Sequence, residues 1–284
     1  MASALEAKEH WDRPEEDELR CADLSSRCII PVMGLHSLVE TSVKFSEATE
    51  KRLHLPSEVT AWRSFDTEVG AAMRALPDGA LVVDLGGGRH FYYANEVDPP
   101  GRLKIIAVDI SPEELALNKD VDETYVADVS RHIPLPDASV DLIMSRVLLE
   151  HVDGVPAAIR EMHRVLRPGG KALHLVPCGN SLFGLGARLL PFGPLLRLTL
   201  KLAPWFGNYA FGFKVYYDHC YPNALEREFR AAGFSNVQLE LSWACEQFFV
   251  GVYPIYLLHA AYEQVVRRLR IRSLAAYIIV RALR

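Results

Sequence analysis

The sequence predicts an α/β protein built on a doubly wound, mostly parallel β-sheet. Apolar runs of strand length alternate with stretches of helical periodicity from residue 78 onward. Half of the residues are hydrophobic, which is ample for a sizeable core. The first apolar run, 80–83, leads through Asp84 and Leu85 into three consecutive glycines at 86–88. A strand that breaks into glycines is typical of a ligand-binding turn at the carboxyl edge of such a sheet.

Residues 1–77 are predicted to form an acidic tail followed by a helical lead-in. Four acidic residues stand in succession at 15–18. Apolar side chains recur at helical spacing within 36–76, with Trp62 and Phe65 among them. Pro77-Asp78-Gly79 ends this region and leads into the first strand. The main domain is therefore predicted to cover 78–284.

Strands and helices continue to alternate along the main domain. After the first run, strands are predicted at about 102–108, 123–127, 140–145, 171–177, 236–243 and 274–282. Helices are predicted to begin at Ser111-Pro112, where a capping hydroxyl precedes a proline, and to cover 156–166 and 223–232. Two apolar segments with basic edges, 178–220 and 246–270, interrupt this order as insertions.

The acid before the glycines indicates which ligand the turn would hold. Dinucleotide-binding turns read G-x-G-x-x-G and place phosphates against backbone N–H groups. Here Phe91 stands at the third glycine position, and Asp84 would repel a pyrophosphate. A carboxylate suits a cationic ligand instead. S-adenosylmethionine carries a sulfonium and an ammonium but no phosphate, and it is therefore the predicted cofactor.

Two later strands also end in aspartate. Asp109 follows the strand at 102–108, at the separation from the glycines where an acid can bind ribose hydroxyls. Asp128 follows the strand at 123–127 and is predicted to accept a hydrogen bond from the adenine amino group, with the Val129 N–H beside it. Three successive strands that each end in aspartate form a more specific pattern than the glycines alone.

These segments resemble the class I S-adenosylmethionine-dependent methyltransferases, in the type 11 subgroup. The matching residues are VVDLGGG at 82–88, IAVDIS at 106–111, ADVSRHIPLPDASVDLIMS at 127–145, LLEHVDG at 148–154 and EMHRVLRPGG at 161–170. The resemblance implies a Rossmann-like, seven-stranded, mostly parallel sheet, a lead-in that acts as a lid, and methyl transfer to an acceptor. It also implies that the cofactor is bound by Asp84, Gly86, Gly87, Gly88, Asp109, Ile110, Asp128, Val129 and Ser145. His90 departs from the family pattern, which has a glycine at this place.

Methyl transfer needs alignment of the acceptor with an already activated methyl group, and a catalytic triad is not required. The acceptor should lie over the carboxyl ends of the fourth and fifth strands. His151, after the fourth strand, and His219, at the exit of the first insertion, are the candidate proton acceptors there. The five cysteines show no metal-type spacing, so no metal site is predicted, and reduced thiols in a cytoplasmic protein are expected.

The two insertions predict a small or lipid-like, hydrophobic acceptor. Residues 160–284 contain 16 lysines and arginines against 7 acidic residues, which also favours contact with an anionic membrane surface, at the inner face for a cytoplasmic protein. Ser145-Arg146-Val147-Leu148 stands where amine methyltransferases have an Asn/Asp-Pro-Pro-Tyr/Phe motif. Oxygen or carbon is therefore favoured as the methylated atom, and a nucleic-acid acceptor is disfavoured.

Two other readings remain open from the sequence. The chain could be a catalytically silent module that keeps the methyltransferase fold for binding, which the His90 departure favours. It could also be a nicotinamide-dependent oxidoreductase on a similar sheet, which Asp84 and Phe91 disfavour. The oligomeric state does not follow from the sequence.

Overall fold

The computed structural model describes residues 32–53, 58–97, 99–182, 184–185, 214–245 and 250–284. The chain divides into two compact units, Met1–Glu40 and Thr41–Arg284. Of the first unit, the described part is the beginning of helix α1 (Val32–Leu53). The sheet and the other described helices all belong to the second unit.

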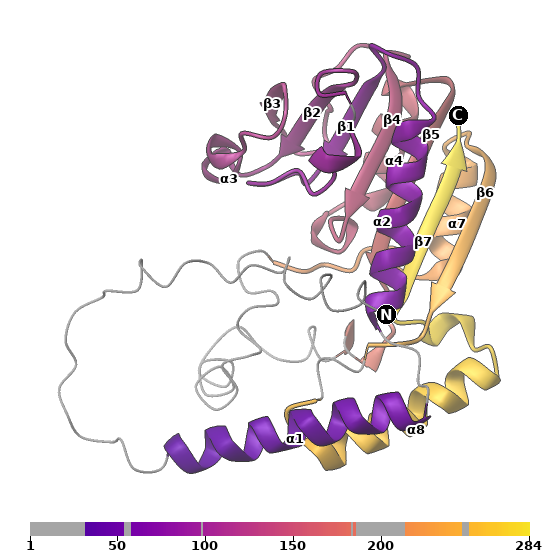
Figure 1. Ribbon diagram of the computed structural model, residues 1–284. Helices are drawn as coiled ribbons and strands as arrows, with labels where there is room; N and C mark the ends of the chain where they lie inside the picture. The colour runs from indigo at the N-terminus through magenta and orange to yellow at the C-terminus, as the bar shows by residue number, and fades with distance from the viewer. Residues whose placement is uncertain (1–31, 54–57, 98, 183, 186–213, 246–249) are drawn as a thin grey trace. The chain divides into compact units, whose positions relative to one another are not determined.

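The second unit contains the predicted seven-stranded sheet, in the order β3-β2-β1-β4-β5-β7-β6 (Figure 1). β7 pairs antiparallel with both of its neighbours, and the other pairings are parallel. The fold class predicted from the sequence is thereby confirmed. The strands are β1 (Leu81–Leu85), β2 (Lys104–Asp109), β3 (Glu123–Val126), β4 (Val140–Arg146), β5 (Leu166–Pro177), β6 (Ser235–Ser242) and β7 (Tyr277–Leu283).

Helices cover both faces of the sheet because successive strand residues point to opposite sides. Val82 belongs to the cluster on one face, where α2 (Glu58–Arg74) buries Phe65, Val69 and Met73. Val83 belongs to the cluster on the other face, which is covered by α4 (Val155–Val165) and α7 (Pro222–Ala231). α2, the second helix of the predicted lead-in, is thus a layer of the sheet's own core. Other helices among the described residues are α3 (Pro112–Leu117), α8 (Tyr253–Arg268) and the 3-10 turns η2 (Ala94–Glu96), η3 (Leu149–His151) and η6 (Arg272–Leu274).

The strand ends that carry the candidate site residues lie along one edge of the sheet. The parallel strands β1 to β5 all finish at this edge, because parallel neighbours run in the same direction. β7 begins there, since Tyr277 pairs with Pro177, and β6 ends there, since Ser242 pairs with Tyr277. The glycine turn after β1, the loop after β4 and the exit of β6 therefore lie along a single edge.

One detail differs from the sequence-based expectation. Arg167-Pro168-Gly169-Gly170 reads as a turn, but β5 already begins at Leu166, which pairs with Val140. The pairing then shifts register, and Gly169 takes a φ of +80°, so the turn residues form an irregularity inside the strand. Among the described residues of the connection between β1 and β2, the regular element is the 3-10 turn η2. Most of the first predicted insertion, 178–220, lies outside the described residues.

Candidate functional site

The three-glycine turn after β1 could not be built from larger residues. Gly86 has a φ of +73°, and a Cβ there would lie 2.9 Å from the Leu148 side chain. At Gly87 an added Cβ would lie 2.9 Å from Cβ of Ala107. Gly88 also has positive φ, but its added Cβ would meet nothing closer than 3.9 Å. The turn therefore packs tightly against its neighbours at two glycines and leaves an open backbone surface at the third.

Asp109, at the end of β2, is fixed to this turn through backbone hydrogen bonds. The Gly88 N–H donates to Oδ2 of Asp109 at 3.1 Å, and the Ser111 N–H donates to Oδ1 at 2.9 Å. Asn118 holds the turn on another side, since its amide donates to the Gly88 carbonyl at 3.0 Å. Each oxygen of the Asp109 carboxylate keeps a further lone pair, which is what a pair of ribose hydroxyls requires.

Asp84 is a buried carboxylate next to the turn. None of the hydrogen bonds formed by the described residues involves its carboxylate oxygens. Burial raises the pKa of Asp84 to about 7; the Arg146 guanidinium opposes this shift, and the Asp109 carboxylate adds to it. A buried acid with so high a pKa gains most from a cationic partner, so the environment of Asp84 fits the charge of S-adenosylmethionine.

The predicted adenine-binding residues lie beside β2 and β3. Ile110 follows Asp109 and is 60% exposed, so its side chain is available for contact with a ligand. Asp128 accepts hydrogen bonds at Oδ1 from the Ser130 N–H at 3.0 Å and from the Ser130 hydroxyl at 2.6 Å. Val129 is buried in the core below this loop. The loop thus holds the Asp128 carboxylate in a fixed orientation.

Ser145 differs from the other predicted cofactor residues, because its side chain is fully buried. Its hydroxyl is 2.8 Å from Nδ1 of His174, its register partner on β5. Burial lowers the pKa of His174 to about 3, so the imidazole is neutral. The hydroxyl therefore ties β4 to β5 inside the sheet.

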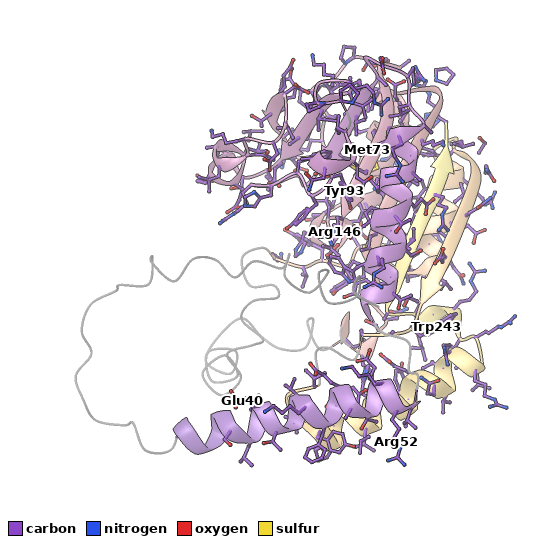
Figure 2. The ribbon with its side chains drawn as sticks, in the orientation of Figure 1. Glu40, Arg52, Met73, Tyr93, Arg146 and Trp243 are labelled. Atoms are coloured by element: carbon purple, nitrogen blue, oxygen red, sulfur yellow. The ribbon has the colours of Figure 1, made fainter. Side chains whose placement is uncertain are left out.

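A group that the sequence reasoning did not assemble surrounds Arg146 at the end of β4. The guanidinium carbon lies 4.4 Å from the ring centre of Trp62 and 4.6 Å from that of Tyr92, within the range of cation–π attraction. Asp66 lies 3.3 Å from Nη2 of Arg146 and accepts a hydrogen bond from the Tyr93 hydroxyl at 2.8 Å. Figure 2 shows Tyr93 and Arg146 beside α2, which supplies Trp62 and Asp66. The helical spacing of Trp62 was visible in the sequence, but its ring contact with a strand-end arginine was not.

His151 lies in η3, directly after the cofactor edge of β4. Its Nδ1 is 3.0 Å from the Lys214 carbonyl, and burial lowers its pKa. The neighbouring Glu150 is buried, and burial raises its pKa to about 8, so this carboxyl carries a proton at neutral pH. His151 and Glu150 thus form a pair of titratable groups where the acceptor is expected.

The described exit of the first insertion, residues 214–220, returns to this place. The Tyr216 and Tyr217 N–H groups both donate to the Glu150 carbonyl, at 2.7 and 3.0 Å. Asp218 accepts from the Val155 N–H at 3.0 Å and lies 2.6 Å from Nδ1 of His219. His219 also takes a φ of +54°, a strained conformation for a residue with a side chain. The structure therefore brings the neighbourhoods of His151 and His219 together.

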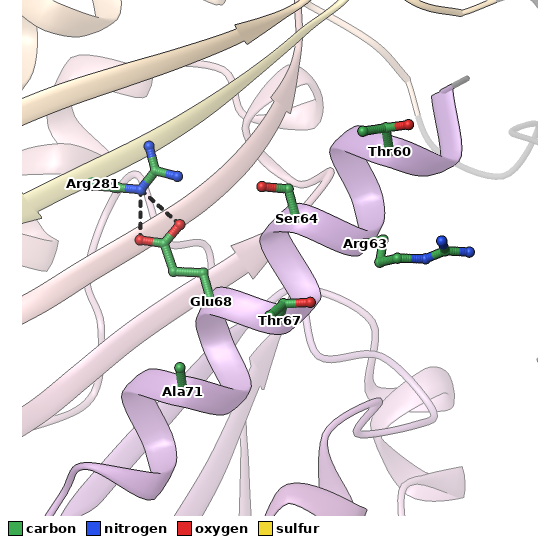
Figure 3. Close-up of a pocket in the computed structure, with 7 residues that line it drawn as sticks. All are labelled: Thr60, Arg63, Ser64, Thr67, Glu68, Ala71 and Arg281. Carbon is green, nitrogen blue, oxygen red and sulfur yellow. Dashed lines mark hydrogen bonds and ion pairs between the residues drawn. The ribbon is translucent and has the colours of Figure 1, made fainter. Parts of the chain in front are cut away.

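A surface pocket on the outer side of α2 is separate from these residues. It is lined by Thr60, Arg63, Ser64, Thr67, Glu68, Ala71 and Arg281. In Figure 3 the Arg281 guanidinium meets the Glu68 carboxylate, with distances of 2.6 and 2.7 Å. None of the predicted cofactor or catalytic residues lines it, so we do not assign the cofactor to this pocket.

Comparisons with known proteins agree with this geometry. Residues 83–174 match the family model described as a methyltransferase domain. The malonyl-[acyl-carrier protein] O-methyltransferase of Serratia marcescens is 30% identical over 110 residues, which is 38% of this chain and 42% of that protein. The ubiquinone/menaquinone biosynthesis C-methyltransferase UbiE of Rubrivivax gelatinosus is 31% identical over 141 residues, which is 48% of this chain and 53% of that protein. The likeness thus spans about half the length of these relatives.

The fold has a counterpart among solved structures. A SAM-dependent methyltransferase from Archaeoglobus fulgidus superposes with a TM-score of 0.50 at 16% identity, over 84% of this chain and 98% of that one. The matched sequence segment holds the glycine turn, Asp109, Asp128 and Ser145. The chain therefore contains, over residues 83–174, a class I S-adenosylmethionine-dependent methyltransferase domain of the type 11 family.

Proposed function

We propose that this protein transfers the methyl group of S-adenosylmethionine to a small or lipid-like, hydrophobic acceptor. The observation that carries the proposal is the turn at Gly86–Gly88 with two carboxylates beside it. The Gly88 N–H donates a hydrogen bond to the Asp109 carboxylate and so anchors it to the turn, and Asp84 is buried with a pKa of about 7. A cationic adenosyl ligand suits both carboxylates, with its charge near Asp84 and its ribose hydroxyls at Asp109, whereas a pyrophosphate would be repelled by Asp84.

Oxygen or carbon is the favoured methyl-accepting atom. The names of the two relatives describe an O-methyltransferase and a C-methyltransferase. In this chain, Glu150 and His151 lie directly after β4; burial raises the pKa of Glu150 to about 8 and lowers the pKa of His151. The neutral imidazole of His151 would accept a proton from a hydroxyl or an acidic carbon as the methyl group is transferred, whereas the Glu150 carboxyl already carries its proton at neutral pH. His219, oriented by Asp218, is the second candidate for this role.

An apolar surface on α8 supports the lipid-like acceptor. Tyr256, His259, Ala260, Glu263 and Val266 form the buried side of this helix. Its exposed side, which we call the α8 apolar face, consists of Ile255, Leu257, Leu258, Val265 and Leu269, with Leu258 75% exposed. Arg267, Arg268 and Arg270 are exposed at the same end of the helix as Leu269.

We propose that the α8 apolar face rests on an anionic bilayer at the inner face of the membrane, where a lipid-like acceptor would be taken up. Apolar side chains beside a row of arginines are the composition expected of a helix that lies in the membrane interface. No helix among the described residues has both the length and the apolar run needed to cross a bilayer.

Calorimetric titration with S-adenosylmethionine and S-adenosylhomocysteine tests the cofactor assignment. We expect both to bind the wild type and NAD not to bind. Asp109→Asn should weaken binding by about 10- to 100-fold, because it removes a charge-assisted hydrogen bond. Asp78→Asn, at an exposed position outside the site, is the control and should bind like the wild type. Absence of binding by the folded wild type, or binding of NAD instead, would contradict the proposal.

Transfer is tested separately with methyl-labelled S-adenosylmethionine. The acceptors would be a hydroquinone with an isoprenoid tail and the malonyl thioester of an acyl carrier protein, two types suggested by the relatives. Label recovered in either product above a control with the Asp109→Asn variant supports the enzyme. Cofactor binding with no transfer to any acceptor would favour the silent binding module instead.

A further inference from the structure

Three buried ionisable side chains meet behind the exposed side of α8. Cys245 follows the end of β6, while His259 and Glu263 lie one turn apart on α8. Their exposed fractions are only 3, 5 and 4% respectively. The methyl-transfer chemistry proposed above uses none of the three.

The distances between the donor atoms of this cluster are close to those between two ligands of a single metal ion. Sγ of Cys245 is 3.7 Å from Nε2 of His259. Two such donors on one tetrahedral zinc ion are separated by about 3.5 Å, given the usual zinc–sulfur and zinc–nitrogen bond lengths. One donor atom from each of the three residues lies within 4.8 Å of the other two.

Glu263 is placed to orient the other members. Its Oε1 is 3.3 Å from Nδ1 of His259, the ring nitrogen opposite the cysteine, which is an ion-pair distance and not yet a hydrogen bond in this geometry. The same oxygen accepts the backbone N–H of Cys245 at 2.6 Å. A carboxylate on the far nitrogen of a histidine is the usual support of a metal-binding imidazole, because it fixes the tautomer and the ring orientation.

We propose that Cys245 and His259 bind a divalent transition-metal ion of the zinc type, with Glu263 fixing the imidazole. A thiolate and an imidazole together select zinc-like ions over magnesium or calcium, which prefer oxygen ligands. The cluster is too buried for a substrate, but an ion needs little space.

The site would have a structural role. β6 ends at the functional edge of the sheet, and Cys245 is three residues beyond that end. His259 and Glu263 are on the helix whose outer side is the α8 apolar face. The Trp243 indole N–H already bonds the Ile271 carbonyl, at 3.1 Å, close in sequence to the cluster. A bound ion would strengthen the link between the end of β6 and α8 that the Cys245 N–H already makes to Glu263.

Cobalt titration of the untagged, full-length protein after treatment with a chelator provides the test. We expect one cobalt ion per chain, a sulfur-to-cobalt charge-transfer band in the near ultraviolet, and loss of that band on addition of zinc. Cys245→Ser should abolish the band and weaken cobalt binding by about 100-fold or more. Glu263→Gln should keep the band but weaken binding by about 10- to 100-fold. Cys220→Ser is the matched control, a buried cysteine in the other core cluster, and should retain both.

Failure of the wild type to bind cobalt, or a band that survives in Cys245→Ser, overturns the proposal, because the sulfur ligand is then absent or lies elsewhere. If Cys245→Ser does not fold, X-ray absorption of the zinc-loaded wild type replaces it. One sulfur and one imidazole in the first coordination shell support the site, and a shell of oxygen alone overturns it. None of these measurements depends on methyl transfer.

Discussion

Asp84 shows how one residue's environment leads to a measurable property of ligand binding. With a pKa of about 7, its carboxyl is about half protonated at neutral pH. A cationic ligand favours the ionised form, so binding should release about half a proton per molecule at pH 7. Titration calorimetry in buffers of different ionisation enthalpy measures this release. Asp84→Asn should bind more weakly and release no proton, and an observed enthalpy that is the same in every buffer for the wild type would contradict the role of Asp84.

Glu150 should make stability depend on pH in the opposite sense from a carboxylate whose pKa is lowered by an ion pair in the folded protein. Burial raises its pKa from 4.5 to about 8, so the folded protein keeps a proton that the unfolded chain releases above its ordinary pKa. The carboxyl therefore destabilises the fold progressively as pH rises from about 4.5 to about 8.

Glu150→Gln should remove this dependence. The free energy of unfolding of the variant, minus that of the wild type, should grow with pH by up to about 1.4 kcal/mol per unit within this window. Urea denaturation at pH 5 and pH 7.5 measures the difference. Glu47→Gln, on the exposed side of α1, serves as the control and should give a flat difference. A flat difference for Glu150→Gln as well would show that the carboxyl is hydrated.

Some site residues could be found from the sequence and others could not, for a physical reason. Asp84, the glycines and Asp109 lie within one strand–turn–strand unit, so their spacing along the chain determines their spacing in space. The group around Arg146 joins a helix to a strand end some eighty residues later. Ser145 was grouped with the cofactor residues by its place in a motif, and its hydrogen bond to His174 depends on the β4–β5 register.

At the scale of the element, the glycine turn can be tested by two matched substitutions. Gly86 and Gly101 have almost the same positive φ, +73° and +78°. A Cβ at Gly86 would lie 2.9 Å from Leu148, but a Cβ at Gly101 would meet nothing within 4 Å. Gly101→Ala therefore isolates the conformational cost, about 1 kcal/mol.

Gly86→Ala should cost more stability than this control and should also weaken S-adenosylhomocysteine binding by at least about tenfold, because Leu148 or the turn must move. Urea denaturation and calorimetry measure the two effects. If the two alanine variants lose equal stability and bind equally well, the tight packing of the turn against Leu148 has no functional consequence.

Helices and strands were predictable from the sequence where the local preferences of the residues, such as capping and turn formation, agree with the strand pairing in the folded sheet. Ser111 caps α3 as expected, with its hydroxyl accepting from the Glu114 N–H at 3.2 Å. The start of β5 was not predictable, because Pro168 and the glycines that follow are turn signals. Pairing with β4 nevertheless holds them inside the strand, next to a register shift. Tertiary contacts outweighed local preference there.

At the scale of the whole molecule, membrane contact is the property to test. Arg267, Arg268 and Arg270, changed together to Glu, should strongly reduce co-sedimentation with vesicles that contain anionic phospholipid at low salt. The control is the same reversal at three exposed arginines on other elements, Arg131, Arg160 and Arg227. That variant has the same net charge and should still bind. Failure of the wild type to sediment with these vesicles, or equal loss in both variants, would contradict a specific role for α8.

The position of β7 has a consequence for how the chain is made. β7 lies between β5 and β6 but follows both in the sequence, and β6 has no other partner in the sheet. During translation, strands β1 to β4 can pair early. The edge of β5 that faces away from β4 stays unpaired until residues 277–283, which form β7, have been synthesised. A nascent chain stalled before that point presents an unpaired strand margin to its neighbours, and this is the stage at which protection by a chaperone would matter most.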